Sequence, residues 1–340
     1  EAVAQSGLPI DNFGGPLVVA APPVELDWAQ RIAIDAAADA GDPGYMRMLK
    51  TAREKDVTAK APLTLFGDVA RRLQDAFGTR GLPITLSTAC ASGATAIQTA
   101  VEALRRGEAE RALAVATDGS VTAEALIRFS LLSALSTQND VPEAASKPFS
   151  KDRDGFVMAE GAATLVLEPL HAARARGATV LGIVQGCGEC ADDFHRTRSS
   201  PDGSPAIGAV KRALEDAGVT PDDIDYINAH GTSTPENDKM EILSLTSVFG
   251  EKLGGRPISS NKSMIGHTLT AAGAIEAVFS LLTIREGMVP PTINHNNPDP
   301  TIDVDVVANI GRNLTVNRVL SNSFGFGGQN ACLVIAAEPA

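Results

Sequence analysis

The sequence predicts an α/β fold in which strands and helices alternate along both halves of the chain. Short apolar runs end at glycine or polar residues, and longer amphipathic stretches separate them. Glycine and alanine are abundant and aromatic residues make up only 4% of the chain, which suits helices packed closely on sheets. Alternation of this kind favours parallel sheets covered on both faces by helices.

Each expected element has its own pattern. Continuous short apolar runs indicate strands, and apolar residues three to four positions apart indicate helices. Glycine follows several of the helices, as is common where a left-handed residue ends a helix. Strands are expected at residues 16–20, immediately before Cys90, and at 111–116, 161–167, 180–185, 224–229, 316–321 and 331–336. Helices are expected at residues 27–40, 63–77, 206–217 and 270–285, and immediately after Cys90.

Composition and charge narrow the class of protein. The chain of 340 residues can bury a large core in one or two domains. Its formal net charge of −12 argues against nucleic acid as the main partner, and an acidic partner protein would need a local basic patch. No apolar stretch reaches the length of a membrane span, and the N-terminus lacks a signal pattern. Four cysteines without framework spacing indicate reduced thiols and a cytoplasmic protein.

Cys90 is the candidate nucleophile. It lies between an apolar strand and a helix rich in small residues. A thiol at a helix N-terminus faces free backbone N–H groups and the positive end of the helix dipole. Both favour the thiolate, which is the nucleophilic form. On this segment alone, a buried structural cysteine is an equally good interpretation.

Two histidines favour the catalytic interpretation. His230 and His267 each follow a short strand-like run, lie beside a glycine and precede a helix-like stretch. A lone histidine is more often structural, but catalytic groups gather in loops at strand ends in α/β folds. Together with Cys90, the two histidines therefore predict an active site.

Five blocks of the sequence resemble the β-ketoacyl-[acyl-carrier-protein] synthases, most closely the type II enzymes of fatty-acid synthesis. They occur in the family's order from about residue 84 to the end, and together they are highly specific. The resemblance implies the thiolase-like fold, a duplicated α/β/α/β/α architecture. The blocks are residues 88–93 with Cys90, 147–156, 228–235 with His230, 261–267 with His267, and 322–328.

The resemblance divides the chain into two thiolase-like halves. Residues 1–169 would carry the nucleophilic cysteine, and residues 170–340 would carry both histidines. Relatives begin with a glycine-rich strand and a helix that this sequence lacks. Either the sequence is a fragment of a longer chain, or the first half lacks its first strand and exposes a sheet edge. Residues 41–62 also match the family poorly.

The expected reaction, again by resemblance, is the decarboxylative Claisen condensation of fatty-acid chain elongation. An acyl chain moves from the phosphopantetheine of an acyl carrier protein to Cys90, and malonyl-carrier then loses CO2 and attacks this thioester. His230 and His267 would donate Nε2–H hydrogen bonds to the enolate. The N–H groups of Cys90 and Phe326 would hold the tetrahedral oxyanion. The resemblance also implies a homodimer.

Other residues take roles from the same resemblance. Lys262 would be a buried, charged group that orients the histidines, with Glu241 as its acidic partner, because a buried lysine without a partner tends to lose its proton. No cofactor is expected beyond a structural monovalent cation, for which oxygen ligands are suited. A plain hydrogen-bond network explains the same residues equally well. The cation would lie among Asn228, Glu276, Ser321 and Asn322.

The glycine-rich run at 324–328 lacks the lysine of a P-loop and the spacing of a dinucleotide loop. A mobile gate fits it better, because glycines absorb large backbone changes and an aromatic ring can block a pocket until Cys90 is acylated. Phe129 falls where relatives line the acyl pocket, and a core aromatic is the alternative. The gate, led by Phe326, would comprise Phe324, Gly325, Phe326 and Gly327.

Two features lie outside this scheme. Cys187 and Cys190 have the spacing of a zinc or redox pair, but one pair is only half of a tetrahedral zinc site, so no transition metal is expected. Gln138 stands where some relatives use an arginine to hold the carrier. The basic residues considered in its place are Lys147, Lys151 and Arg128.

Four other functions share parts of the pattern. A non-elongating partner of the chain-length-factor type usually lacks the nucleophilic cysteine, which this chain keeps. A thiolase uses a second cysteine as base, and an initiating synthase replaces one histidine by asparagine; neither pattern is present. A polyketide or specialised long-chain ketosynthase has the same catalytic set and stays open.

Overall fold

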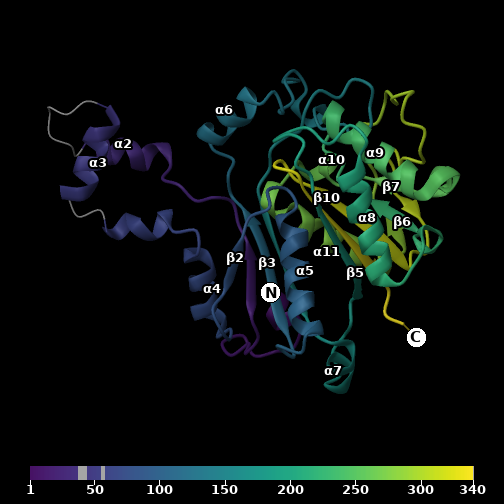
Figure 1. Cartoon of the computed structure of the whole chain (residues 1–340), viewed down its shortest axis with the longest axis horizontal. Helices are drawn as coiled ribbons and strands as arrows, with labels where there is room; N and C mark the ends of the chain where they lie inside the picture. Colours follow the sequence, from purple (N-terminus) through teal and green to yellow (C-terminus); the bar gives the residue numbers. More distant parts are fainter. Residues whose placement is uncertain (37–43, 55–57, 340) are drawn as a thin grey trace.

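Two central sheets, with helices between and around them, make up the body of the molecule (Figure 1). The computed structural model describes residues 1–36, 44–54 and 58–339. Within this part of the chain the first sheet has the strand order β2-β1-β3-β4 and the second has the order β5-β11-β10-β6-β7. The duplicated α/β architecture expected from the sequence is therefore present.

The first sheet takes its strands from the first half of the chain. β3 (Ala112–Asp118) is parallel to β1 (Leu17–Ala20), which is parallel to β2 (Ile84–Leu86). β4 (Gly161–Leu167) runs antiparallel to β3. Successive residues of β1 enter two different cores, as period-2 alternation requires in a sheet covered on both faces.

The second sheet is also mixed, so the expectation of parallel sheets is wrong for the last strand of each half. β10 is parallel to β6 but antiparallel to β11, because a turn of only four residues joins β10 to β11 and a parallel crossover needs a long connection. The strands of this sheet are β5 (Ile183–Ala191), β6 (Tyr226–Asn228), β7 (Ile258–Ser259), β10 (Arg318–Phe324) and β11 (Gln329–Ala336).

Two helices form the layer between the sheets. α5 (Ser92–Arg105) and α11 (Ala272–Glu286) share one apolar core with the inner faces of both sheets. Their N-terminal turns touch backbone to backbone: a Cβ on Gly93 would lie 2.4 Å from the Ala274 nitrogen. Small residues at this crossing therefore let the two helix N-termini meet.

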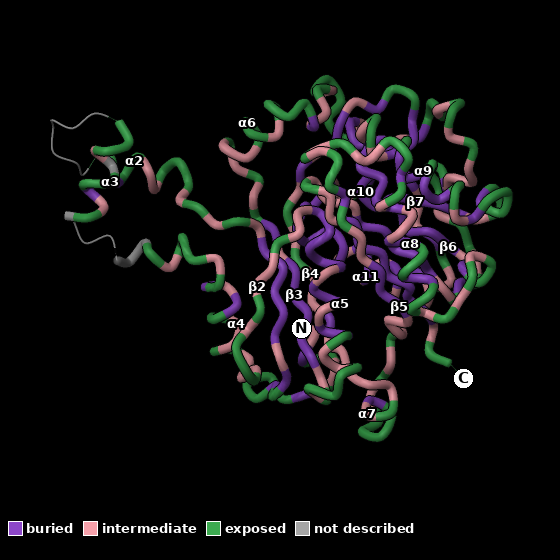
Figure 2. Tube along the Cα trace, viewed as in Figure 1, coloured by how far each residue is buried: buried purple, intermediate pink, exposed green. Residues whose placement is uncertain are grey.

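The remaining helices cover the outer faces or extend from the body. α1 (Ala2–Gln5) and α4 (Asp68–Phe77) cover the first sheet, and α8 (Ser204–Ala217) and α9 (Pro235–Phe249) cover the second. The segment with α2 (Trp28–Ala36) and α3 (Gly44–Glu54) projects away from the sheets (Figure 1) and is largely exposed (Figure 2). Shorter elements are α6 (Ala123–Leu131), α7 (Leu170–Ala175), α10 (Lys262–Ile265), β8 (Met288–Val289) and β9 (Arg312–Asn313).

Some predicted boundaries shift. The helix expected at 63–77 begins only at Asp68, because a 3-10 turn that contains Pro62 precedes it. The strand expected at 180–185 lies at Ile183–Ala191, and the end of the helix expected at 27–40 falls outside the described residues. The two sheets fall on either side of residue 169, but the division into two domains stays a prediction. In the described ranges, no helix has both the length and the apolar character needed to cross a membrane.

Candidate active site

A strained turn presents Cys90 at the start of α5. Ala89, the residue before it, has a φ of 50°, a left-handed conformation that costs an L-residue roughly 1–2 kcal/mol. Ser92 holds the turn closed, because its Oγ accepts from the Thr88 N–H at 2.8 Å and donates to the Ala89 carbonyl at 2.6 Å. The thiol is thereby fixed at the inner end of a cavity.

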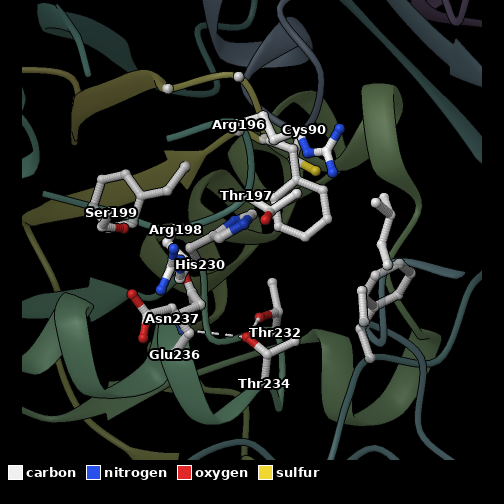
Figure 3. A pocket seen from close by; sticks show the side chains of 18 of the residues that line it. Cys90, Arg196, Thr197, Arg198, Ser199, His230, Thr232, Thr234, Glu236 and Asn237 are labelled. Carbon is white, nitrogen blue, oxygen red and sulfur yellow. Dashed lines mark hydrogen bonds between the residues drawn. The ribbon is translucent and has the colours of Figure 1, made fainter. Parts of the chain in front are cut away.

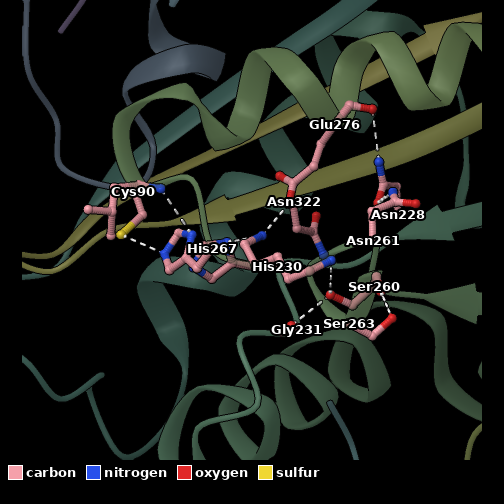
Figure 4. A network of polar contacts seen from close by, with 12 residues as sticks. Cys90, Asn228, His230, Gly231, Ser260, Asn261, Ser263, His267, Glu276 and Asn322 are labelled. Atoms are coloured by element: carbon pink, nitrogen blue, oxygen red, sulfur yellow. Dashed lines mark hydrogen bonds and ion pairs between the residues drawn. The ribbon is translucent and has the colours of Figure 1, made fainter. Parts of the chain in front are cut away.

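Cys90 and both histidines meet in one buried cluster (Figure 4). The His267 Nε2 atom lies 3.0 Å from Cys90 Sγ, and the two imidazole rings are 5.3 Å apart, edge to face. One ligand atom from each of the three side chains lies within 4.8 Å of the other two. Residues 90, 230 and 267 are far apart in sequence, so the fold alone brings them together.

Backbone bonds to the first half of the chain position His267. Its N–H donates to the Val157 carbonyl at 2.7 Å, and its carbonyl accepts from the Ala159 N–H at 3.0 Å. Gly266, with a φ of 73°, lets the chain turn into this contact, where a Cβ would lie 2.8 Å from Ala159 Cβ. His267 is thus held by the half of the chain that carries Cys90.

Hydrogen bonds to the Nδ1 atoms fix the tautomer of both histidines. His267 Nδ1 accepts from the Leu269 N–H at 3.3 Å, and His230 Nδ1 lies 3.3 Å from Lys262 Nζ, a donor. Each neutral ring therefore carries its proton on Nε2. The two Nε2–H groups are the hydrogen-bond donors expected from the sequence.

Burial keeps both imidazoles neutral. It holds the pKa of His230 and of His267 well below the usual value, and the nearby Lys262 lowers both further. A neutral imidazole can donate a hydrogen bond without first gaining a proton, which suits both rings to hold a developing oxyanion.

The expectation of a stabilised Cys90 thiolate is wrong. Burial raises the pKa of the Cys90 thiol to about 11, and the Lys262 charge and the Phe326 N–H only partly offset this rise. Burial outweighs the helix N-terminus because the charged sulfur would lose most of its hydration. The resting thiol is protonated, so it must pass on its proton as it attacks.

The glycine-rich run after β10 lies directly over the nucleophile. The Phe326 N–H donates a hydrogen bond to Cys90 Sγ, which lowers the pKa of the thiol; its role as an oxyanion donor stays a prediction. A Cβ on Gly325 would lie 2.7 Å from the Thr88 carbonyl, and Gly327 has a φ of 89°. Phe324 lies 5.8 Å from the ring of His230. Gly325 is therefore required because the backbone of residue 88 lies too close for a side chain, and Gly327 because its positive φ is unfavourable for other residues.

Lys262 is buried as expected, but its acidic partner is Glu276, not Glu241. Lys262 Nζ pairs with Glu276 Oε1, and both side chains are almost fully buried. Glu241 instead accepts from the N–H groups of His230 and Gly231, each at 2.8 Å, and from Asn322 Nδ2 at 3.0 Å. Glu241 therefore clamps the loop that carries His230. Burial raises the pKa of Glu276 to about 7, against the opposing effect of Lys262.

Buried oxygens without hydrogen-bond partners test the expected cation site. Glu276 Oε2 and Asn322 Oδ1, two of the expected ligands, are such atoms, as is Asn261 Oδ1. Asn228 is different, since its Oδ1 accepts from Asn261 Nδ2 at 3.0 Å. Ser321 is buried beside Asn228 in the pairing of β10 with β6. Hard oxygen donors that lack partners fit a monovalent cation in part, with Asn261 in place of Asn228.

The cluster opens into a cavity of about 330 Å³ (Figure 3). Phe129 lines it and packs edge to face on Phe156, which in turn lies 5.3 Å from His267. Phe326 joins the same apolar cluster. The cavity is therefore apolar beside the thiol and polar at its outer wall, which includes Asp192, residues 195–199, Thr232 and residues 234–237.

The cysteine and histidine donors do not favour a transition metal. At the Cys90 cluster both Nε2 atoms carry protons and offer no lone pair to a metal, because their Nδ1 atoms accept from other donors. Cys187 and Cys190 lie three residues apart on β5, so their side chains point to opposite faces of the sheet.

Sequence reasoning missed three parts of the site. Asn261, at the start of one of the matching blocks, could have been found from its neighbour Lys262. The role of Leu269, a backbone N–H that fixes the tautomer of His267, leaves no side-chain signal. The role of Val157 in anchoring His267 is likewise a backbone contact between distant segments.

Comparisons with known proteins agree with this geometry. Residues 22–173 match the family described as "Beta-ketoacyl synthase, N-terminal domain", and residues 181–296 match "Beta-ketoacyl synthase, C-terminal domain". The two matches together cover most of the chain and include Cys90, His230, Lys262 and His267.

Curated relatives cover a similar region. The chain is 44% identical over 257 residues to the 3-oxoacyl-[acyl-carrier-protein] synthase 2 of Staphylococcus aureus (strain COL), which is 76% of this chain and 62% of that protein. It shows the same identity and coverage with the protein of that name from Coxiella burnetii (strain RSA 493 / Nine Mile phase I). The chain thus spans about 62% of the length of the curated relatives that it matches.

Solved structures share the fold. A β-ketoacyl synthase from Burkholderia phymatum STM815 superposes with a TM-score of 0.86 at 32% identity, over 99% of this chain and 81% of that one. A ketosynthase described in complex with a type II polyketide acyl-carrier protein gives a TM-score of 0.83 at 32% identity, over 96% of this chain and 78% of that one. These likenesses confirm the predicted thiolase-like fold.

Proposed function

The chain belongs to the β-ketoacyl synthase family, and from this premise we propose that it condenses an acyl chain with malonyl-[acyl-carrier-protein] in fatty-acid elongation. The observation that carries the proposal is the meeting of one thiol and two neutral Nε2–H donors at the inner end of a single cavity. A nucleophile beside two oxyanion donors is what the two steps of this reaction require.

The first step is a transthioesterification. Cys90 Sγ attacks the carbonyl carbon of the acyl-carrier thioester, and the tetrahedral oxyanion is held by the N–H groups of Cys90 and Phe326. The C–S bond to the carrier then breaks, and the thiol proton of Cys90 passes to the departing carrier thiolate. The acyl chain extends along the apolar wall that includes Phe129.

The second step begins when malonyl-carrier loses CO2. The enolate oxygen that forms is held by the Nε2–H groups of His230 and His267, which donate while neutral. Its α-carbon attacks the Cys90 thioester, and collapse of the tetrahedral intermediate expels the Cys90 thiolate. The products are the 3-oxoacyl-carrier and CO2, and one proton from solvent restores the thiol.

Intact-mass spectrometry tests this proposal directly. The protein and its Cys90→Ala variant are incubated with a panel of acyl-carrier thioesters, and malonyl-carrier is added afterwards. We expect the acyl mass on the wild type only, followed by its loss to a β-ketoacyl product. Acylation without condensation would indicate a transferase, and no acylation by any chain length would indicate a non-elongating partner subunit.

A polyketide or specialised ketosynthase is the second candidate. The observation that favours it is the likeness to the ketosynthase of a type II polyketide system, which has a TM-score of 0.83. The same acyl-carrier panel separates the two candidates. Turnover of saturated chains supports fatty-acid elongation, and turnover of β-ketoacyl chains alone supports a polyketide enzyme.

The proposal also includes two protein partners, an acyl carrier protein and a second copy of the chain. An acyl carrier protein delivers the substrates, and two copies of the chain form a homodimer. The dimer is supported by the edge position of β2, where Leu82 and Ile84 are exposed, since a free strand edge favours pairing with another chain. Size-exclusion chromatography at low concentration would contradict the dimer if it showed a stable, fully active monomer.

The site needs no cofactor for either step. A monovalent cation, if bound, would be held by Glu276, Asn322 and Asn261, and would neutralise buried oxygens beside Lys262. We place the enzyme in the cytoplasm, because four cysteines in the reduced state suit that compartment.

A further inference from the structure

Two arginines on the outer wall of the active-site cavity have no role in the proposed chemistry. Arg196 and Arg198 both line the cavity that holds Cys90, and Figure 3 shows their side chains among those that surround it. Both residues are exposed, so each lies where a ligand entering from solvent would pass.

The loop that carries these arginines is well anchored. Its first residue, Asp192, donates its N–H to the Gly328 carbonyl at 2.7 Å and accepts from the Ser200 N–H at 2.7 Å. The Arg196 carbonyl accepts from the Gly327 N–H at 2.8 Å. The backbone at Arg196 is therefore tied directly to the glycine-rich run that lies over the nucleophile.

Neither guanidinium is engaged inside the protein. Across the described ranges, no hydrogen bond or ion pair joins the side chain of Arg196 or Arg198 to another residue. By contrast, two of the three residues that the sequence suggested for carrier docking are occupied: Lys147 bonds Asp152 at 2.9 Å, and Arg128 pairs with Glu25. The third, Lys151, does not line the cavity. The arginine pair is thus a free cationic group in a chain of net charge −12.

The other charged groups of the cavity wall leave this pair available. Asp154 accepts from Ser136, Thr137 and Gln138, and Asp192 caps its own loop. His195 accepts the Thr197 N–H on Nδ1 at 3.2 Å. Glu236 is exposed and forms no ion pair with either arginine within the described part of the chain.

We propose that Arg196 and Arg198 bind the phosphate of the phosphopantetheine arm whose thioester reaches Cys90. This inference rests on the proposed function, which requires such an arm in the cavity. Guanidinium groups present several N–H donors in a planar fork and match phosphate geometry better than a point charge does. The shared ligand chemistry is a phosphate linked to pantetheine, whether the arm is attached to a carrier protein or to CoA.

The test compares two small acyl donors that differ only in the phosphate. The rate of Cys90 acylation is measured by intact mass with S-acyl-phosphopantetheine and with S-acyl-pantetheine. We expect wild type to prefer the phosphorylated donor by roughly tenfold or more, through a lower KM. In the Arg196→Ala/Arg198→Ala variant this preference should fall to about one, while the rate with the pantetheine donor stays the same.

Two further variants sharpen the result. Arg80→Ala removes an exposed arginine far from the cavity wall and should leave the preference unchanged. Glu236→Gln removes a negative charge near the pair and should tighten phosphopantetheine binding roughly two- to fivefold. A preference that survives in the double variant, or that wild type lacks, would overturn the proposal.

A third arm separates the phosphate from the protein that carries it. If the double variant loses turnover with acyl-carrier protein but keeps its preference between the small donors, the arginines contact the carrier surface, and the proposal is wrong. Calorimetric titration with phosphopantetheine and with pantetheine needs no acylation. Phosphate-dependent binding that the double variant loses would support the inference even if no donor acylated Cys90, in which case only the proposed function would fail.

Discussion

The two halves of the chain use the same order of elements and differ at one edge. In the first half β1, α4, β2, α5, β3 and β4 occur in this order, with α2, α3 and α6 inserted. In the second half β6, α9, β7, α11, β10 and β11 occur in the equivalent order, with α10, β8 and β9 inserted. The strand orders correspond as well, with β2-β1-β3-β4 matching β7-β6-β10-β11. The second sheet has one more strand, β5, paired antiparallel with β11.

Among the described strands, β5 of the second sheet has no counterpart in the first sheet. Within the described residues β4 is an edge strand, and it borders a groove of about 1250 Å³ that is lined mainly by apolar residues. That the first half lacks its first strand stays a prediction. The described strands of the two halves correspond in the middle layer, which holds Cys90 and His267, and differ at the edge remote from these residues.

The same position in each half contributes to the site. Cys90 lies between β2 and α5, and Lys262 and His267 lie in the equivalent connection between β7 and α11. The two helix N-termini meet at Gly93 and Gly273, which brings the two connections together. One half of the chain thus carries the nucleophile, and the other half carries the side-chain hydrogen-bond donors.

The largest effect is expected at Lys262, the buried cation of the second half. Lys262→Met leaves the Glu276 carboxylate buried without its partner, which should lower the free energy of unfolding by about 3–5 kcal/mol near pH 8. The loss should be smaller near pH 5.5, because burial raises the pKa of Glu276 to about 7 even beside Lys262, and removal of Lys262 raises it further, so the carboxyl is neutral at pH 5.5 in both proteins. Urea unfolding at both pH values measures this.

The control for this variant is Lys252→Met, which removes a lysine from an exposed ion pair with Asp222. Exposed pairs contribute at most about 1 kcal/mol. Equal effects of the two variants at pH 8 would show that the Lys262–Glu276 pair has no special role.

The next largest effect is expected on the rate of condensation, with little effect on the rate of Cys90 acylation. His267→Ala removes one Nε2–H donor from the second half, so condensation should slow by about 10²–10³-fold. Acylation of Cys90 should remain within roughly tenfold of wild type, because the backbone N–H groups of Cys90 and Phe326 hold that oxyanion. Rapid-quench mass spectrometry follows both steps, with His171→Ala, an exposed histidine, as the control. Equal loss in both steps would contradict the division of roles.

A smaller loss of stability is expected from a substitution at the contact between α5 and α11. Gly273→Ala places a Cβ 2.6 Å from the Ala94 nitrogen, so α5 and α11 must separate. We expect a loss of about 1–3 kcal/mol in the free energy of unfolding, together with slower acylation. Gly119→Ala is the matched control, since nothing lies within 4 Å of its Cβ. A stable and fully active Gly273→Ala variant would show that close approach of the helices is dispensable.

The smallest effect concerns acid stability. Burial holds the pKa of His230 and His267 well below 6.5, so below about pH 6.5 the unfolded chain binds protons that the folded chain does not. The two histidines should therefore lower the stability as pH falls below 6.5, by up to about 1.4 kcal/mol per pH unit for each histidine. Glu276 acts in the opposite direction, because its raised pKa makes the folded chain bind that proton first. His230→Gln should reduce this slope between pH 6.5 and 5 in urea unfolding. An unchanged slope would show that His230 is not kept neutral by the fold.

Local sequence determined much of this protein. Apolar periodicity placed β1, β3, β4, α5 and α8 within a few residues, because each element buries one side in a regular pattern. Cys90, His230 and His267 were found from their positions at strand ends and from the blocks around them. These features depend only on residues close together in the chain, so they can be recognised in the sequence without the structure.

Tertiary structure decided the protonation states of the active-site residues and the partner of the buried lysine. The partner of Lys262 is Glu276 and not Glu241, since distance in space, not spacing in sequence, selects an ion pair. The pKa of Cys90 is raised because burial outweighs the helix N-terminus. The His267 tautomer depends on the backbone N–H of Leu269. Burial and hydrogen-bond geometry involve atoms from distant segments, and only the folded chain brings those atoms together.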